Sequence, residues 1–314
     1  IDCHTHICFA GSRSHDFTDR LRGISYQEIL SRGGGIFDTV DKTRKTSKEK
    51  LTNGLLERCN RQLRQGITTC EVKSGYGLSI ADELKMLRSI QQAQSKTPLS
   101  LIPTCLAAHV LPKEFSNHQD YLSHIIKELF PKLKQESLTK RVDIFIEPEA
   151  FPVKLAENFL KEAQQQQFDI TVHADQFTQG GALLAAKLKA CSADHLESSK
   201  KEDLQALSKA NVCGVALPGA SIGLGIPFAP VHQMLDNDLC VAIASDWNPG
   251  SAPMGDLLSQ AAILAAYEKL SSAEVFAGIT YRAAQALKLN DRGTIAEGKR
   301  ADFTIFPTND YREI

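Results

Sequence analysis

The stretch Cys3-His4-Thr5-His6 decides the fold prediction for this chain of 314 residues. It sets two histidines at alternate positions of a short apolar run, and alternate residues of a strand face the same side. Three later apolar runs end in residues of similar chemistry, namely Val172-His173-Ala174-Asp175, Ala193-Asp194-His195 and Ala244-Ser245-Asp246. In a closed parallel barrel the C-terminal ends of all strands meet on one face, so we expect these side chains to lie together.

Eight short apolar runs predict buried parallel strands. After the opening run they are 67–73, 99–107, 142–147, 169–174, 193–196, 212–217 and 241–246. Helical patterns separate or follow them, at 51–63, 82–95, 118–136, 153–166, 181–189, 202–210, 254–269 and 272–288. This alternation predicts an α/β protein with a (β/α)8 TIM barrel, and a doubly wound open sheet is the alternative. Polar tips on the first, fifth, sixth and eighth strands favour closure, because an open sheet would spread them along an edge.

The last part of the chain breaks the alternation. Residues 293–306 resemble two strands around a turn rather than a ninth barrel unit. We therefore predict two domains, a barrel over residues 1–290 and a partial β-sandwich segment over 291–314. Since Ile1 already lies inside the first strand, we expect the N-terminal partner strands of that small, incomplete appendage to be missing from this chain.

Charge, hydropathy and cysteine content limit the kinds of binding partner that we expect. The formal net charge is -1, which gives no reason to expect nucleic acid. No apolar stretch reaches the ~18 residues that would span a bilayer, so we expect no membrane partner. The eight cysteines are scattered without a C-x-x-C pair, which is typical of reduced thiols in a cytoplasmic protein. The sequence is also compatible with a homodimer.

The polar tips predict a metal site. We expect His4, His6, His173 and Asp246 to bind one divalent ion and to leave a position open for water. Nitrogen and oxygen donors without a thiolate suit Zn²⁺ or Fe²⁺ equally. Such an ion lowers the pKa of bound water to about 7 and polarises a carbonyl, so the pattern predicts a hydrolase.

Other residues near strand ends are candidates for proton transfer, structural support and substrate binding. His195 is expected to polarise the scissile carbonyl or move a proton, and Asp246 to take the proton of the attacking water. Asp194 is expected to point away and to be structural. Lys73 and Glu147 also end strands and could bind a second metal ion, but a single ion is the simpler interpretation. Arg13 is either a solvated loop charge or a clamp for a substrate carboxylate, which a guanidinium binds through two parallel hydrogen bonds.

Taken together, these residues resemble the metal-dependent amidohydrolase superfamily and, within it, the family of imidazolonepropionases. The similar segments run in order along almost the whole chain: 4–6, 11–13, 32–36, 73–78, 108–109, 173–175, 192–195, 246–251 and the closing 293–302. Lys73-Ser74-Gly75-Tyr76-Gly77-Leu78 and Asp246-Trp247-Asn248-Pro249-Gly250-Ser251 are the most specific of them.

The resemblance implies an activity and a pocket. The reaction would be hydrolysis of the cyclic amide C–N bond of 4-imidazolone-5-propanoate to N-formimino-L-glutamate, a step of histidine degradation. The implied substrate pocket contains Arg13, Tyr76, His109, Gln176, Asn248, Gly250 and Ser251. Some relatives have glutamate where this chain has Gln176, which cannot act as a base, so Asp246 and His195 remain as the proton carriers. The alternatives are a purine or pyrimidine base aminohydrolase and a non-catalytic barrel that binds a small ligand.

Overall fold

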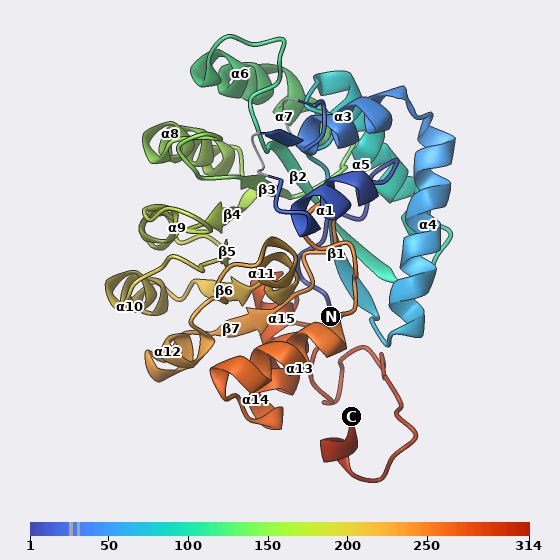
Figure 1. The fold of residues 1–314 in the computed structure, drawn as a ribbon, viewed down its shortest axis with the longest axis vertical. Helices are drawn as coiled ribbons and strands as arrows, with labels where there is room; N and C mark the ends of the chain where they lie inside the picture. Colours follow the sequence, from blue (N-terminus) through green and yellow to red (C-terminus); the bar gives the residue numbers. More distant parts are fainter. Residues whose placement is uncertain (25–27, 30–31) are drawn as a thin grey trace.

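The structure, a computed structural model, describes residues 1–24, 28, 29 and 32–314. Its centre is a parallel sheet of seven strands in the order of the sequence, surrounded by helices (Figure 1). The strands are β1 (Thr69–Lys73), β2 (Ser100–Ala108), β3 (Arg141–Ile144), β4 (Asp169–Ala174), β5 (Ser192–His195), β6 (Cys213–Ala216) and β7 (Val241–Ile243). Each pairs in parallel with the next, and a doubly wound sheet would instead reverse its strand order. The open-sheet alternative is therefore wrong.

The opening run is not a regular strand, contrary to the prediction. It forms only single bridges, from Asp2 to Cys70 and from Thr5 to Trp247. Its backbone nevertheless joins both edges of the sheet. Glu71 N donates to Asp2 O at 2.9 Å on one side, and Asp246 N donates to His4 O at 3.1 Å on the other. Residues 1–6 thus close the sheet into a TIM-like barrel.

Helices cover the outside of the sheet (Figure 1). Those that precede β4 are α1 (Ser14–Leu21), α3 (Ile36–Lys45), α4 (Lys48–Arg64), α5 (Ile80–Gln94), α6 (His118–His124), the π-helix η1 (Ile125–Leu129), α7 (Phe130–Gln135) and α8 (Val153–Gln165). Those that follow it are α9 (Gly181–Leu188), α10 (Lys201–Lys209), α11 (Pro218–Leu224), α12 (Val231–Asp236), α13 (Leu257–Glu268), α14 (Ser272–Ile279) and α15 (Tyr281–Ala286).

Local sequence explains where several helices begin and end. Helix α4 starts after Ser47, whose side chain accepts from Lys50 N, and it is followed by Gly66 at φ +81°. A capping box formed by Ser271 and Glu274 is present at the start of α14. The single helix predicted over 272–288 is interrupted at Thr280, where φ is -125° and ψ is -100°.

The end of the chain differs from the prediction. Residues 293–306 form no strand, and the only regular element after α15 is a short 3-10 helix, η2 (Tyr311–Glu313). The two expected strands are therefore not found. The segment lies instead against the N-terminal end of the barrel, where Thr304 Oγ1 donates to Gly66 O at 2.6 Å. The division into a barrel over 1–290 and a sandwich segment over 291–314 stays a prediction.

Candidate active site

Four predicted ligands converge at the C-terminal ends of the strands. His4 Nε2 and His6 Nε2 are 3.2 Å apart, and His173 Nε2, at the end of β4, is 3.4 Å from His6 Nε2. Asp246 Oδ1 lies 3.5 Å from His4 Nε2 and 3.3 Å from His6 Nε2. All four residues are at most 3% exposed. Three imidazole nitrogens and a carboxylate oxygen this close, inside a barrel, form a donor set that fits one divalent ion.

The opposite ring nitrogens of two histidines face carboxylates. His4 Nδ1 is 2.6 Å from Asp194 Oδ2, and His173 Nδ1 is 3.0 Å from Asp143 Oδ2 on β3. The hydrogen bond to Asp194 fixes the tautomer and orientation of His4 for binding a metal through Nε2, and the nearby Asp143 carboxylate orients His173. The prediction that Asp194 points away from the site is therefore wrong, and Asp143 was not predicted at all.

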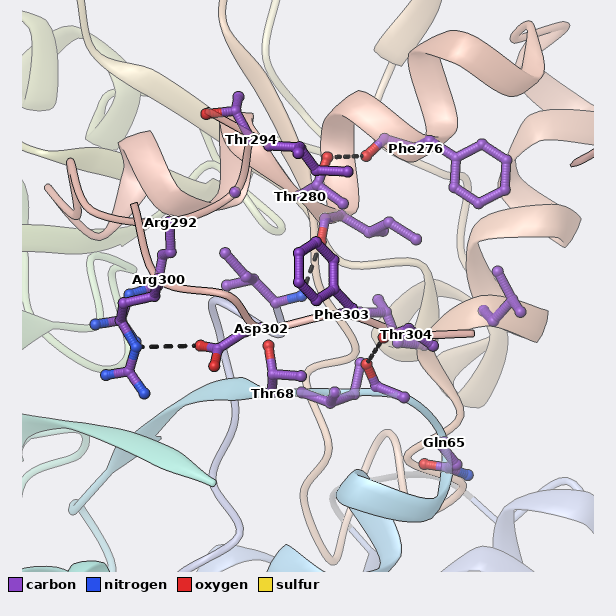
Figure 2. A pocket seen from close by; sticks show the side chains of 18 of the residues that line it. Gln65, Thr68, Phe276, Thr280, Arg292, Thr294, Arg300, Asp302, Phe303 and Thr304 are labelled. Carbon is purple, nitrogen blue, oxygen red and sulfur yellow. Dashed lines mark hydrogen bonds and ion pairs between the residues drawn. The ribbon is translucent and has the colours of Figure 1, made fainter. Parts of the chain in front are cut away.

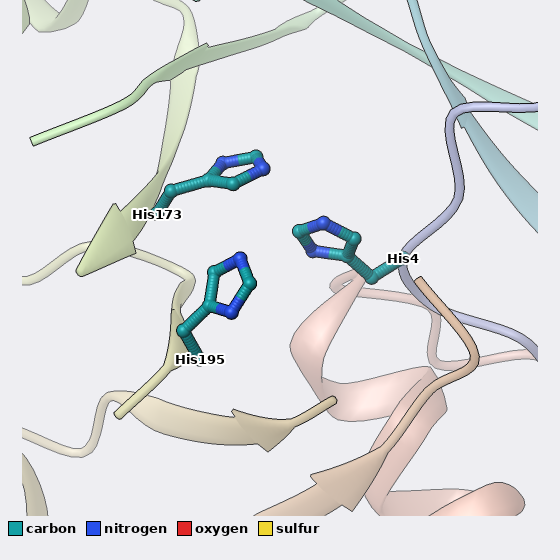
Figure 3. Close-up of side chains that lie close together, drawn as sticks. All are labelled: His4, His173 and His195. Carbon is teal, nitrogen blue, oxygen red and sulfur yellow. The ribbon is translucent and has the colours of Figure 1, made fainter. Parts of the chain in front are cut away.

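His195 also turns into the site (Figure 3). Its ring nitrogen can join those of His4 and His173 in a cluster whose ligand atoms all lie within 4.8 Å. The backbone explains why neighbours Asp194 and His195 both contact the site. His195 has φ +85°, which ends the alternation of a regular strand. Its Nδ1 lies 3.3 Å from Glu197 Oε1, so a carboxylate holds this ring as well.

The charges in the cluster are uneven. Burial lowers the pKa of His6 well below its usual value, which keeps that ring neutral as a ligand must be. Burial and Lys73 oppose protonation of His4, but Asp194 and Asp246 outweigh them and raise its pKa to about 9. Burial would raise the pKa of Asp246, yet its contacts with His4 and His6 hold it well below the usual range. Asp246 is thus ionised at neutral pH, as a ligand and proton acceptor requires.

A cavity of about 150 Å³ opens above this cluster. Six of the seven predicted pocket residues line it, namely Arg13, Tyr76, His109, Gln176, Asn248 and Ser251. Sequence reasoning missed the apolar part of the wall, formed by Ile36, Val110 and Phe145. Ile36 ends the segment 32–36 that resembles the imidazolonepropionases, and that resemblance was the only signal that pointed to it.

Gly250 does not line the cavity but supports Arg13. A Cβ at Gly250 would lie 2.3 Å from Arg13 Nη1, so a larger residue there would force the guanidinium to move. On its other side, Arg13 Nε donates to Asp16 Oδ2 at 2.8 Å, and the same oxygen accepts from Gly35 N. Arg13 is therefore not a solvated loop charge: its Nε is engaged, and its side chain is 11% exposed.

His109 and Asn248 carry defined hydrogen-bonding roles. His109 Nδ1 lies 3.0 Å from Gly75 O, which can only accept, so Nδ1 carries the proton and Nε2 remains an acceptor. Burial, with a further contribution from His173, lowers the pKa of His109 to about 3 and keeps it neutral. Asn248 Oδ1 accepts from Gly250 N and Ser251 N at 2.7 and 2.8 Å, which fixes the loop after Asp246.

The second-metal alternative finds no support at Lys73 and Glu147. Lys73 Nζ lies 2.8 Å from both Asp143 Oδ2 and Glu71 Oε2, deep in the barrel. Glu147 Oε1 accepts from Phe177 N at 2.8 Å, and its Oε2 accepts from the Thr178 hydroxyl. Both side chains are thus held by protein groups.

The sequence has many relatives. The model of the amidohydrolase family matches residues 27–312. An imidazolonepropionase of Acinetobacter baumannii is 41% identical over 318 residues, which cover 100% of this chain and 79% of the relative. The chain belongs to the amidohydrolase family, among the imidazolonepropionases. A family member from Bdellovibrio bacteriovorus is also 41% identical and covers 96% of this chain and 71% of its own length.

Solved structures share the fold at much lower identity. A 5-methylcytosine deaminase from Klebsiella pneumoniae has a TM-score of 0.74 at 15% identity, over 96% of this chain and 77% of its own. An atrazine chlorohydrolase from Arthrobacter aurescens, solved with zinc, has a TM-score of 0.65 at 14% identity, over 96% and 73%. These similarities support the TIM-like barrel. No helix in the described ranges is both long and apolar enough to cross a membrane.

Proposed function

We propose that this chain is a metal-dependent hydrolase that opens the ring of 4-imidazolone-5-propanoate to N-formimino-L-glutamate. Sequence similarity to imidazolonepropionases across the whole chain supports the assignment. The observation in the site that carries it is the pairing of two features in one cavity: a histidine and carboxylate donor set at its floor and the Arg13 guanidinium in its wall. A substrate with a scissile ring amide and a carboxylate arm needs both.

We propose His4, His6, His173 and Asp246 as the residues that hold one Zn²⁺ or Fe²⁺. When bound there, such an ion lowers the pKa of water and polarises the ring carbonyl. The Nε2 atoms of His4 and His173 and Oδ1 of Asp246 all lie within 3.4 Å of His6 Nε2, which supports this assignment.

Proton transfer falls to Asp246 and His195. In the reaction, the oxygen of water bonds to the ring carbonyl carbon and the carbon–nitrogen bond breaks. Asp246, ionised and buried, takes a proton from the attacking water, and the departing ring nitrogen then receives one. His195, held through Nδ1 by Glu197, lines the cavity and presents Nε2 there as a group that can move a proton. Gln176 can orient a ring N–H but has no proton to exchange.

The remaining pocket residues bind the two ends of the substrate, its propionate and its ring. Arg13, fixed by Asp16, offers its terminal nitrogens to the propionate carboxylate. His109, with Nε2 as an acceptor, suits a ring N–H of the substrate better than its carboxylate. Tyr76, Asn248 and Ser251 complete the wall around the ring.

Purified protein with measured metal content tests the proposal against its nearest rival. Ring opening of 4-imidazolone-5-propanoate, followed by loss of its ultraviolet absorbance, should far exceed any release of ammonia from guanine or cytosine. A base aminohydrolase would give the reverse result. Metal bound without turnover of any of these compounds would favour a non-catalytic barrel.

A further inference from the structure

We propose that Lys73 is a positioning residue that holds two metal-binding histidines in place through one carboxylate each. Lys73 Nζ lies 2.8 Å from Asp143 Oδ2 and 3.7 Å from Asp194 Oδ2. These are the oxygens that face His173 Nδ1 at 3.0 Å and His4 Nδ1 at 2.6 Å. One ammonium group therefore connects the supports of two histidines whose Nε2 atoms converge on the other side.

The carboxylates need this cation because they cannot reach water. Asp143 is 0% exposed, and Asp194 and Glu71 are each 1% exposed. Three buried carboxylates without a cation between them repel one another, and breaking a buried ion pair leaves an uncompensated charge. Arg141 Nε is 3.8 Å from Glu71 Oε1 and cannot replace Lys73 between the other two. Without Lys73, we expect Asp143 and Asp194 to move apart and to release the two rings.

Lys73 takes no part in the reaction itself. It is 0% exposed and does not line the cavity, so it acts only through the aspartates. The inference rests on the proposed function in one respect, since it takes His4 and His173 as metal ligands. It goes beyond that function by assigning metal affinity to a lysine that never touches the metal.

Metal affinity is the decisive measurement. In Lys73→Met, the dissociation constant for Co²⁺ or Zn²⁺, measured by competition with a chelator, should rise about 10- to 100-fold, the usual cost of losing such support. The visible spectrum of the Co²⁺ protein should change as well, because the ligand geometry changes. Lys85→Met is the matched control, since Lys85 also pairs with a carboxylate, Asp82 at 2.8 Å, but outside the site.

A second variant separates positioning from stability. Glu71 lies 2.8 Å from Lys73 Nζ but contacts no histidine of the cluster. Lys73→Met with Glu71→Gln therefore restores the buried charge balance without restoring the link between Asp143 and Asp194. We expect folding stability to recover in the double variant while metal affinity stays low. The double variant also decides the matter if Lys73→Met alone does not fold.

The outcomes separate this inference from the proposed function. Metal affinity that recovers together with stability, or that is unchanged in Lys73→Met, would overturn the role of Lys73. Wild-type protein that binds neither Co²⁺ nor Zn²⁺ would instead overturn the proposed metal site.

Discussion

The two ends of the barrel each have a cavity, and the larger of the two lacks a cluster of convergent polar groups. The cavity at the N-terminal end holds about 400 Å³, against about 150 Å³ at the strand tips. Figure 2 shows that the larger cavity lies between the segment 292–304 and residues just before β1, such as Gln65 and Thr68, with the apolar side chain of Phe303 in its wall. Its charged groups are already paired, as in the contact of Arg300 with Asp302 at 3.2 Å.

At the strand tips the polar groups instead converge on a common point. Nε2 of His6 faces two other ring nitrogens and a carboxylate within 3.4 Å. The contrast teaches that convergent donors, rather than volume, locate the chemistry of this barrel. Changes at the strand tips should therefore reduce activity in a folded protein, and changes at the other end should reduce stability alone.

The largest expected effect is that of His173→Ala. Removing one of the proposed ligands should abolish both metal binding and ring opening, measured by metal analysis of the purified variant and by turnover. His232→Ala is a matched control, because the His232 side chain is 60% exposed on the surface. Full metal occupancy in His173→Ala would remove this residue from the ligand set.

His195→Ala should cost about 10² to 10⁴ in rate while the metal stays bound, the usual contribution of a positioned acid–base group. Retained metal distinguishes a proton carrier from a ligand, which matters because His195 lies in the same cluster. The comparison variants are Gln176→Glu, which should keep substantial activity, and Gln176→Ala. If Gln176→Ala abolished turnover and His195→Ala left it unchanged, residue 176 would be the central group.

Arg13→Lys should weaken substrate binding by roughly 1–3 kcal/mol, the range for a lost hydrogen bond to a charged group. Lysine keeps the charge but loses both the planar fork and the Nε contact with Asp16. Steady-state kinetics should show the change mainly in KM. Arg88→Lys, in the half-exposed pair with Glu136, is the control. Equal kinetics for wild type, Arg13→Lys and Arg13→Ala would contradict the clamp.

The smallest expected effect is at the other end of the barrel. Thr304→Val removes the hydrogen bond to Gly66 O and should lower the free energy of unfolding by about 0.5–1.5 kcal/mol. Denaturant unfolding measures that change, and turnover should equal that of wild type. A drop in turnover beyond what lost stability explains would show that the two ends are coupled.

Much of the fold follows from local pattern. Seven apolar runs are strands within a few residues of the predicted bounds, because strands buried on both faces leave a continuous apolar signal. The opening run was predicted as a strand because its residues looked buried; residues 2–9 are indeed buried, but the run pairs only through isolated bridges. At the tail, residues 293–306 resembled two strands around a turn, yet no strand forms there.

The candidate site was predictable where a residue ends a strand. His173 and Asp246 could be found because their position alone puts them on the correct face. Asp143 and Glu71 could not, since a charged residue inside an apolar run gives no sign of which partner it meets across the barrel. The signal that was present is their occurrence, with Lys73 and Arg141, in strands whose residues are all buried.

Closure of the sheet by residues 1–6 has a consequence for synthesis of the protein. His4 and His6 leave the ribosome more than two hundred residues before their partner Asp246 and the backbone of Trp247. Until then the growing sheet has two open edges, which can pair with other chains. Metal cannot nucleate such a fold. An ion that binds only the folded protein stabilises the folded state. Supply of the ion should therefore affect the lifetime of the folded protein rather than its folding rate.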